Sequence, residues 1–173
     1  MSRIKHEIDL PVAVCERFLL SGTLFIYPER EPRLVMVGGE RRSDESLAVG
    51  LNRKDYHSFK KLIAKAEQLF QQADNCPNLM PIDKFTCDMT LRFVVGYLKI
   101  QDFIIFLELS FDRNLRALFT ISLSDNASDQ FVELKAGTED FRRVRKWIND
   151  TDSVLEELLV KGMLLESFST RDE

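Results

Sequence analysis

Apolar residues recur at helical spacing in the segment that follows Asn52. The stripe consists of Tyr56, Phe59, Leu62, Ile63, Ala66, Leu69, Phe70 and Ala73. Asn52 is a suitable N-cap, and Asp55 follows it three residues on, as in a capping box. The pattern therefore predicts an amphipathic helix with a polar outer face.

A second helical stripe follows Thr138, where two acidic residues in the first turn favour a helix N-terminus. Its members are Phe141, Val144, Trp147, Ile148, Val154, Leu155, Leu158 and Leu159. Gly162 predicts the end of the helix. The polar run at 149–153 competes for backbone hydrogen bonds and predicts a break into two segments.

The remainder of each half reads as strands, from alternating polarity and from β-branched and aromatic residues. We expect strands at 4–10, 17–27, 33–38 and 46–51, and again at 89–97, 103–111, 115–123 and 130–136. In the first strand, Ile4, His6, Ile8 and Leu10 share one face. The run 112–114, Asp-Arg-Asn, predicts a tight hairpin.

The two halves match when the chain is shifted along itself without gaps, so that Phe18 meets Phe103 and Leu24 meets Leu109. Each half then reads as four strands and a helix. We expect one domain, 1–173, with a first repeat at 1–74, a linker at 75–84, a second repeat at 85–165 and a polar tail at 166–173. Two unrelated α+β modules of similar size are the alternative.

The predicted fold class is therefore α+β, with two antiparallel four-stranded sheets, each followed by a helix, in a pseudo-twofold ββββα-ββββα order. The joint SLAVGLNRKDYHSFKKLI at 46–63 and its echo at 131–148 share a strand, a polar cap and an aromatic-led helix. In this order of elements the chain resembles the Whirly family, and each half resembles the positive cofactor four family. The Lys-Gly-Lys-Ala-Ala-Leu motif of Whirly strands is not present, and LLSGTLFI at 19–26 occupies its place. The resemblance implies binding of single-stranded nucleic acid.

Composition narrows the function classes. The 173 residues are 45% hydrophobic and 30% charged, with no apolar run long enough to span a membrane and no apolar signal core at the start, so we expect a soluble, non-secreted chain without membrane contact. Three cysteines without a CxxC spacing indicate free thiols in a reducing compartment, the cytoplasm of a bacterium or of an infected host cell. A net charge of -4 argues against a broad basic face for duplex DNA, but it allows a local groove.

Cations and aromatics on the expected strands and loops are candidate ligands for phosphates and bases. The candidate nucleic-acid-binding residues are Lys5, Arg17, Phe25, Tyr27, Arg33, Arg41, Arg42, Arg92, Tyr97, Lys99 and Arg116. Phe106 is a further aromatic outside the helix-facing register. Each of these side chains can instead be a solvated charge or part of the packing. The pair Arg41-Arg42 can clamp a phosphate or be neutralised by the acids around it.

The sequence lacks the patterns that catalysis and metal binding require. His6 and His57 are the only histidines, and HExxH, GxSxG, P-loop and GxGxxG motifs are absent. Carboxylates such as Asp88, Glu108 and Glu133 are scattered over the expected strands without a pairing that selects them. We therefore expect a protein that is not an enzyme and has no cofactor or metal.

Three functions fit these observations. The first is binding of single-stranded DNA in transcription or replication, in a protein of phage origin, with RNA polymerase or replication proteins as partners. The second is a host-takeover or inhibitor module that docks on another protein through Phe25, Tyr27 and Phe106. The third is RNA binding. Exposed sheet edges and the apolar run ELLVKGMLL at 157–165 also suggest a homo-oligomer.

Overall fold

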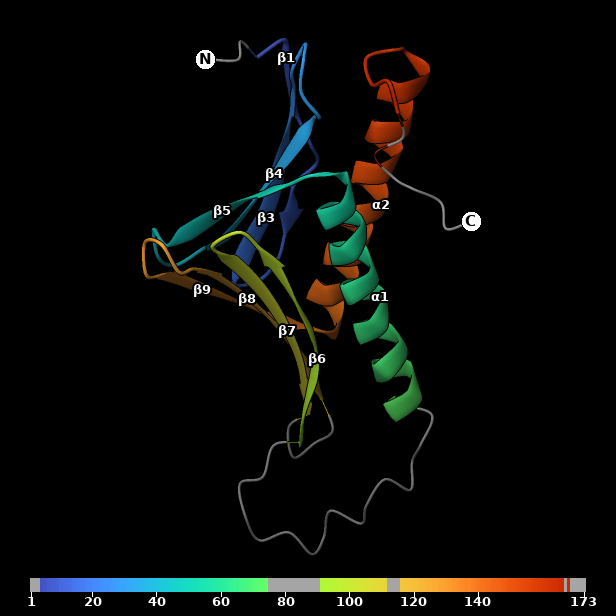
Figure 1. Ribbon diagram of the computed structural model, residues 1–173. Coiled ribbons are helices and arrows are strands. Elements are labelled where there is room, and N and C mark those ends of the chain that lie inside the picture. Colours follow the sequence, from blue (N-terminus) through green and yellow to red (C-terminus); the bar gives the residue numbers. More distant parts are fainter. Residues whose placement is uncertain (1–3, 75–90, 112–115, 167, 169–173) are drawn as a thin grey trace, which may run out of the picture.

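The computed structural model describes residues 4–74, 91–111, 116–166 and 168. Within these residues the chain forms two antiparallel sheets and two long helices, which is an α+β fold (Figure 1). The expected linker at 75–84 and the expected hairpin at 112–114 lie outside the described residues.

The first sheet contains five strands, which are β1 (His6–Asp9), β2 (Ala13–Val14), β3 (Phe18–Ile26), β4 (Arg33–Glu40) and β5 (Ser46–Leu51). Their order is β1-β3-β4-β5, and β2 pairs with β3 beside β1. The strand expected at 4–10 is therefore shorter than predicted and is followed by a second short strand. Pro11 lies between the two, and proline has no N–H for a strand ladder.

The second sheet contains β6 (Leu91–Ile100), β7 (Phe103–Phe111), β8 (Ala117–Asp125) and β9 (Gln130–Gly137), in that order. The register of β6 and β7 shifts between Val94 and Gly96. β6 and β8 each extend beyond the end of the predicted strand, because both continue to the turn that joins them to the next strand. β7 agrees with the prediction.

Helix α1 (Arg53–Asp74) begins with the expected cap. The backbone N–H of Asp55 donates to Oδ1 of Asn52 over 2.8 Å, and the N–H of Asn52 donates to Oδ2 of Asp55 over 3.3 Å. These reciprocal bonds satisfy donors that a helix start would otherwise leave unpaired.

Helix α2 (Thr138–Val160) is continuous, so the predicted break at 149–153 is wrong. The polar side chains there have partners that are compatible with a helix. Ser153 Oγ donates to the carbonyl of Asn149 over 3.0 Å, and Asp152 accepts from Tyr56 Oη and Lys60 Nζ of α1 over 3.0 and 2.8 Å. Gly162, with φ of +70°, follows the end of the helix as expected.

Each helix packs on strands of the other half of the chain. Helix α1 contacts β6 and β7 of the second sheet as well as β4 and β5 of the first, and α2 contacts β2 of the first sheet as well as β8 and β9. Trp147 of α2 is buried beside Gly22 and donates from Nε1 to the carbonyl of Pro11 over 2.7 Å. Phe119 of β8 stacks on Phe141 of α2 with ring centroids 3.7 Å apart. Because the helices contact strands of the other half, the two halves share one hydrophobic core.

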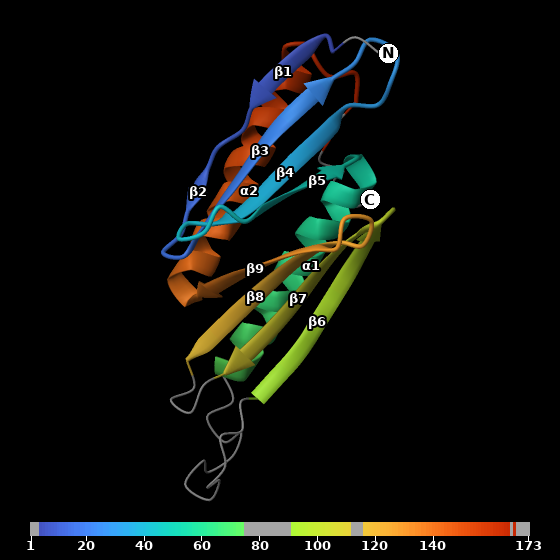
Figure 2. The same ribbon diagram turned by 90° about the vertical axis from the view of Figure 1, so that its left-hand side faces the viewer.

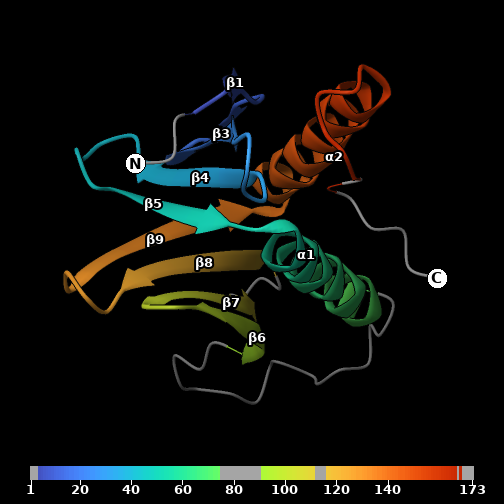
Figure 3. The ribbon, with the colours of Figure 1, turned by 45° about the horizontal axis from the view of Figure 1, so that its top comes forward.

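The helices cover one side of the sheets and leave the other side open. Figure 2 shows the strands of both sheets in front and both helices behind them. In Figure 3 β4, β5, β9 and β8 follow one another across the molecule, so the two sheets meet where β4 and β5 contact β9. We call this boundary the junction. At the junction, a Cβ on Gly38 would lie 2.7 Å from Leu134 Cδ1 and 2.8 Å from Leu123 Cδ1, so only glycine allows this approach.

The two halves share much of their element spacing. The offset in sequence between the starts of β3 and β7, at Phe18 and Phe103, equals the offset between the starts of α1 and α2, at Arg53 and Thr138. The match is incomplete, because the first half has two short strands where the second half has the single long β6.

Candidate nucleic-acid interface

The open face of the second sheet is defined by the pairing register, which brings alternate residues of four strands into rows. One row contains Tyr97, Phe106, Ser122 and Glu133, the next contains Val94, Glu108, Thr120 and Lys135, and a third contains Lys99, Ile104, Ser124 and Phe131. The opposite positions, such as Ile105, Leu107 and Leu134, are buried beneath the helices.

Aromatic side chains are accessible on this face. Tyr97 is 70% exposed and Phe131 is 55% exposed, while Phe106, the direct partner of Tyr97, is half-buried. Each ring offers a flat apolar surface on which an unpaired base can stack. Lys99 is exposed in the row that ends with Phe131, so a cation accompanies the aromatics.

The open face of the first sheet has a different chemistry. Its outward positions on β2 to β5 carry mostly small or uncharged side chains, which are Val14, Leu19, Ser21, Thr23, Val35, Val37, Gly39, Ser46, Ala48 and Gly50. On β1 the outward positions are the acidic residues Glu7 and Asp9. Phe25 and Arg33 pair at one end of this face. Phe25 is half-buried, and the stem of Arg33 lies over Gly50. This face therefore presents few groups that can contact a base or a phosphate.

Four cations gather at the junction. Arg17, Arg42 and Lys135 line a hollow of about 390 Å³ with Glu40 and Glu133. Beside it, Arg17, Lys135 and Arg116 line a hollow of about 350 Å³ that also includes Glu16 and Asp140. We call Arg17, Arg42, Arg116 and Lys135 the junction cluster. These side chains come from the β2–β3 turn, the β4–β5 loop, the start of β8 and β9.

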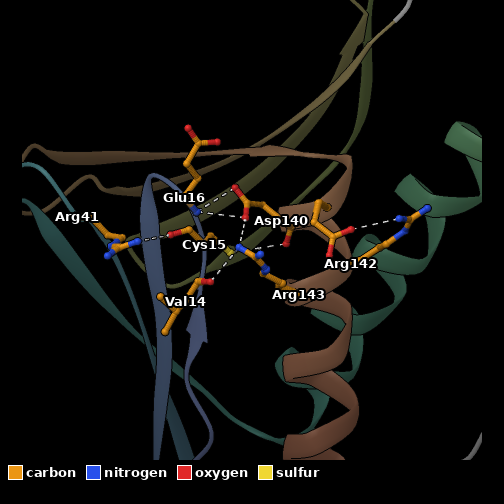
Figure 4. Close-up of polar contacts among 8 residues, drawn as sticks. Val14, Cys15, Glu16, Arg41, Asp140, Arg142 and Arg143 are labelled. Atoms are coloured by element: carbon orange, nitrogen blue, oxygen red, sulfur yellow. Dashed lines mark hydrogen bonds and ion pairs between the residues drawn. The ribbon is translucent and has the colours of Figure 1, made fainter.

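The turn that carries Arg17 is anchored to the first turn of α2 (Figure 4). The backbone N–H of Glu16 donates to both carboxylate oxygens of Asp140, over 3.2 and 3.1 Å. Arg143 donates to the same carboxylate over 3.0 Å and to the carbonyl of Val14 over 3.4 Å. Because Asp140 is only 7% exposed, the network fixes the turn and so the position of Arg17.

Cys15 lies inside this network. Its side chain is fully buried, and burial together with the charge of Asp140 raises the pKa of the thiol to about 12. The thiol is therefore protonated at neutral pH and acts as a small apolar group in the turn.

Arg41 and Arg42 have separate surroundings, although they are neighbours in sequence. Arg41 donates from Nη1 to the carbonyl of Cys15 over 3.1 Å, which ties the β4–β5 loop to the β2–β3 turn. Arg42 lines the hollow of the junction cluster. Arg42 therefore lines the hollow, whereas Arg41 supports the loop.

Four other predicted residues lie at the far end of the first sheet. Lys5 and Tyr27 line a hollow of about 430 Å³ with Arg30, Arg53 and Phe168. Phe25 and Arg33 lie nearby on β3 and β4. The nearly extended chain from Arg17 to Tyr27 spans about 30 Å, so this group and the junction cluster are separate surfaces.

The predicted residues of β6, which are Arg92, Tyr97 and Lys99, lie on the open face of the second sheet. Arg92 and Tyr97 are exposed, and Nε of Arg92 is 3.9 Å from Oε1 of Glu108. The structure thus divides the predicted residues among the junction, the far end of the first sheet and β6.

Two residues of this surface were missed by the sequence prediction, Lys135 and Phe131. Both alternate along β9 with the buried Val132, Leu134 and Ala136. That period-two pattern was visible in the sequence and could have identified them, because it separates the open face from the core face.

Other functional features are limited in the part of the chain that the structure describes. Over these residues, no group of three or more His, Cys, Asp or Glu side chains is placed to hold a metal ion. Neither described helix combines the length and the apolar character needed to cross a membrane.

Comparisons with known proteins leave the family open. No model of a known protein family matches the sequence, and no curated protein matches it. Among solved structures, the crystal structure of WHY1 from Arabidopsis thaliana aligns over 99% of this chain and 99% of its own, with 7% sequence identity and a TM-score of 0.39. At these values the likeness carries no argument about function.

Proposed function

We propose that this protein binds single-stranded nucleic acid, with DNA favoured over RNA, on the open face of its second sheet and at the junction. One observation carries the proposal: exposed aromatic rings lie on the open face of the second sheet, and the junction cluster adjoins that face. Stacked bases and neutralised phosphates are the two interactions that sequence-tolerant strand binding requires.

In this mechanism Tyr97, Phe106 and Phe131 stack with bases, and each stacked base contributes about 1 to 3 kcal/mol. Arg17, Arg42 and Lys135 neutralise phosphates and release their counterions. In a duplex the neighbouring base pairs stack on one another and cover the flat faces of the bases, so stacking on protein side chains selects single strands. The hollows of the junction cluster also contain Glu16, Glu40, Glu133 and Asp140, so these cations bind phosphates individually and do not form a broad basic face.

We further propose that binding occurs without catalysis or a cofactor and that the two halves descend from one ββββα unit of Whirly type. We also propose that the protein acts in transcription or replication, next to RNA polymerase or replication proteins. The same proposal includes self-association. Exposed single strands occur in both processes.

The test is fluorescence anisotropy with labelled single-stranded DNA, single-stranded RNA and duplex DNA of equal length over a salt series. We expect single strands to bind more tightly than duplex, with DNA ahead of RNA, and the logarithm of affinity to fall linearly with the logarithm of salt concentration. Equal or tighter duplex binding would contradict the stacking mechanism. The absence of binding at low salt would reject the proposed function and favour docking on a protein.

A further inference from the structure

Glu108 is a carboxylate in the middle of the proposed strand-binding face. It pairs with Val94 on β6 and with Thr120 on β8. Phe106 precedes it by two residues and lies on the same face, about 7 Å away along the strand. A negative charge at this position opposes phosphate binding, so its place beside the aromatic platform points to contact with bases instead.

The oxygens of Glu108 are available as hydrogen-bond acceptors. Its side chain is 23% exposed, and Nε of Arg92 is 3.9 Å from Oε1, which is beyond hydrogen-bond distance. Glu133 on the same face differs, because Nζ of Lys135 lies 3.1 Å from its Oε2. Arg92 is close enough to offset part of the negative charge of Glu108, but it forms no hydrogen bond with the carboxylate oxygens.

An ionised carboxylate accepts hydrogen bonds and donates none. An exocyclic amino group on a stacked base can donate to it, whereas a carbonyl at the same ring position presents lone pairs and is repelled. Thr120 and Ser122, the β8 partners of Glu108 and Phe106, are each only 9% exposed, and their hydroxyls can donate or accept, so they add no such bias.

We propose that Glu108 gives the face a preference for bases that carry an exocyclic amino group over thymine and uracil. The inference rests on the proposed function. Cytosine has an amino group at ring position 4 where thymine has a carbonyl. The two bases also differ at N3, which is an acceptor in cytosine and an N–H donor in thymine, and at C5, where thymine carries a methyl group, so the change of preference in a Glu108 variant is the deciding observation. Their ring sizes and stacking surfaces are otherwise similar.

The experiment measures anisotropy with labelled oligo-dC and oligo-dT of about 15 nucleotides, a length within the range of single-strand sites. The wild-type protein is expected to bind oligo-dC about tenfold more tightly, as for a carboxylate that accepts from the cytosine amino group. The Glu108→Gln variant should reduce this ratio to less than about twofold. Its amide can serve either base, and the loss of a negative charge leaves oligo-dT binding unchanged or tighter.

Two matched variants separate recognition from general effects. Glu133→Gln makes the same change on the same face at a carboxylate that is already ion-paired, and it should keep the ratio of wild type. Arg92→Gln should weaken binding to both oligonucleotides equally. Thermal unfolding of each variant checks that it folds.

The possible results distinguish the two proposals. Equal binding of both oligonucleotides by wild type, or an unchanged preference in Glu108→Gln, would overturn this inference and leave the proposed function standing. Binding to neither oligonucleotide would reject the proposed function, and this inference with it.

Discussion

The two sheets have the same antiparallel construction and turn their covered faces toward the same pair of helices, yet their open faces differ. On the first sheet the outward side chains are small and mostly uncharged, as at Ser21, Val37 and Ala48. On the second sheet the equivalent surface carries Tyr97 and Lys135. Shared topology therefore does not imply a shared role, because function depends on the side chains placed on the fold.

The junction connects these unequal surfaces. The first sheet contributes Arg17 and Arg42 from its loops, while the second contributes Lys135 and Arg116. In this account the first sheet supplies two cations and a rigid frame, and the second sheet supplies the surface on which bases stack.

The largest effect is expected from charge reversal at the junction. The double variant Arg17→Glu with Arg42→Glu should lower the affinity for single-stranded DNA about 100-fold at low salt and reduce the salt slope by about two. The control is Lys5→Glu with Arg30→Glu at the far end of the first sheet, which should change affinity less than about threefold. A comparable loss in both double variants would show that the effect is one of net charge and not of the junction.

The second largest effect is expected from a substitution at Gly38, where the two sheets approach closely. The methyl group of Gly38→Ala would lie 2.7 Å from Leu134 Cδ1, so the core must shift and the free energy of unfolding should fall by about 1 to 3 kcal/mol. Gly50→Ala on β5 is the control, since the nearest atom, 3.0 Å away, is Cδ of the exposed and flexible Arg33. Urea unfolding measures both, and equal stabilities would contradict the close packing at the junction.

The comparison of the two open faces is tested directly by aromatic truncation. Tyr97→Ala should weaken binding about tenfold through the loss of one stacked base. Phe25→Ala on the first sheet should change affinity less than about twofold, although it should reduce stability more, because Phe25 is half-buried and Tyr97 is 70% exposed. The reverse order of affinities, measured by anisotropy, would assign binding to the first sheet.

The smallest effect concerns the anchored turn and its pH dependence. Burial raises the pKa of Cys15 from 9.0 to about 12, so the folded protein keeps this proton at a pH where the unfolded chain has released it. The contribution to stability is complete below pH 9 and is lost as the pH rises toward 12. Between pH 8 and pH 10 we expect Cys15 to account for about 1 kcal/mol of lost stability.

Comparison with the Cys15→Ala variant isolates this contribution in chemical unfolding experiments at the two pH values. The variant should lose less stability than wild type over the same interval. Identical losses would mean that the thiol titrates alike in the folded and unfolded chain.

Much of the fold could be predicted from the sequence, because local residue patterns determine the helices and strands. Residues within one or two helical turns determine the Asn52 cap, the long α1 and the position of Gly162 just after the end of α2. The error at 149–153 arose because Asp152 is held by Tyr56 and Lys60, whose proximity depends on tertiary packing. The polar side chains at 149–153 can compete for backbone hydrogen bonds, but the tertiary contacts of Asp152 with Tyr56 and Lys60 outweigh this competition.

The candidate site was harder to predict, because it also depends on tertiary packing. Cations could be picked out as polar positions on strands and loops, but the sequence could not show that Arg17 and Arg116 meet at the junction while Lys5 lies at the far end. It also could not show that Arg41 bonds to the carbonyl of Cys15. Such groupings depend on how the sheets approach each other, which no local pattern encodes.

The most direct test of the central claim is a titration of the isotope-labelled protein with single-stranded oligo-dC, followed by amide chemical shifts in two-dimensional NMR. If single strands bind to the second sheet and the junction, the largest shifts will lie along the open face of β6–β9 and around Arg17 and Arg42, with small shifts in β1 and at Tyr27. Shifts confined to the first sheet or to the hollow beside Tyr27 would contradict it. So would the absence of any change at low salt.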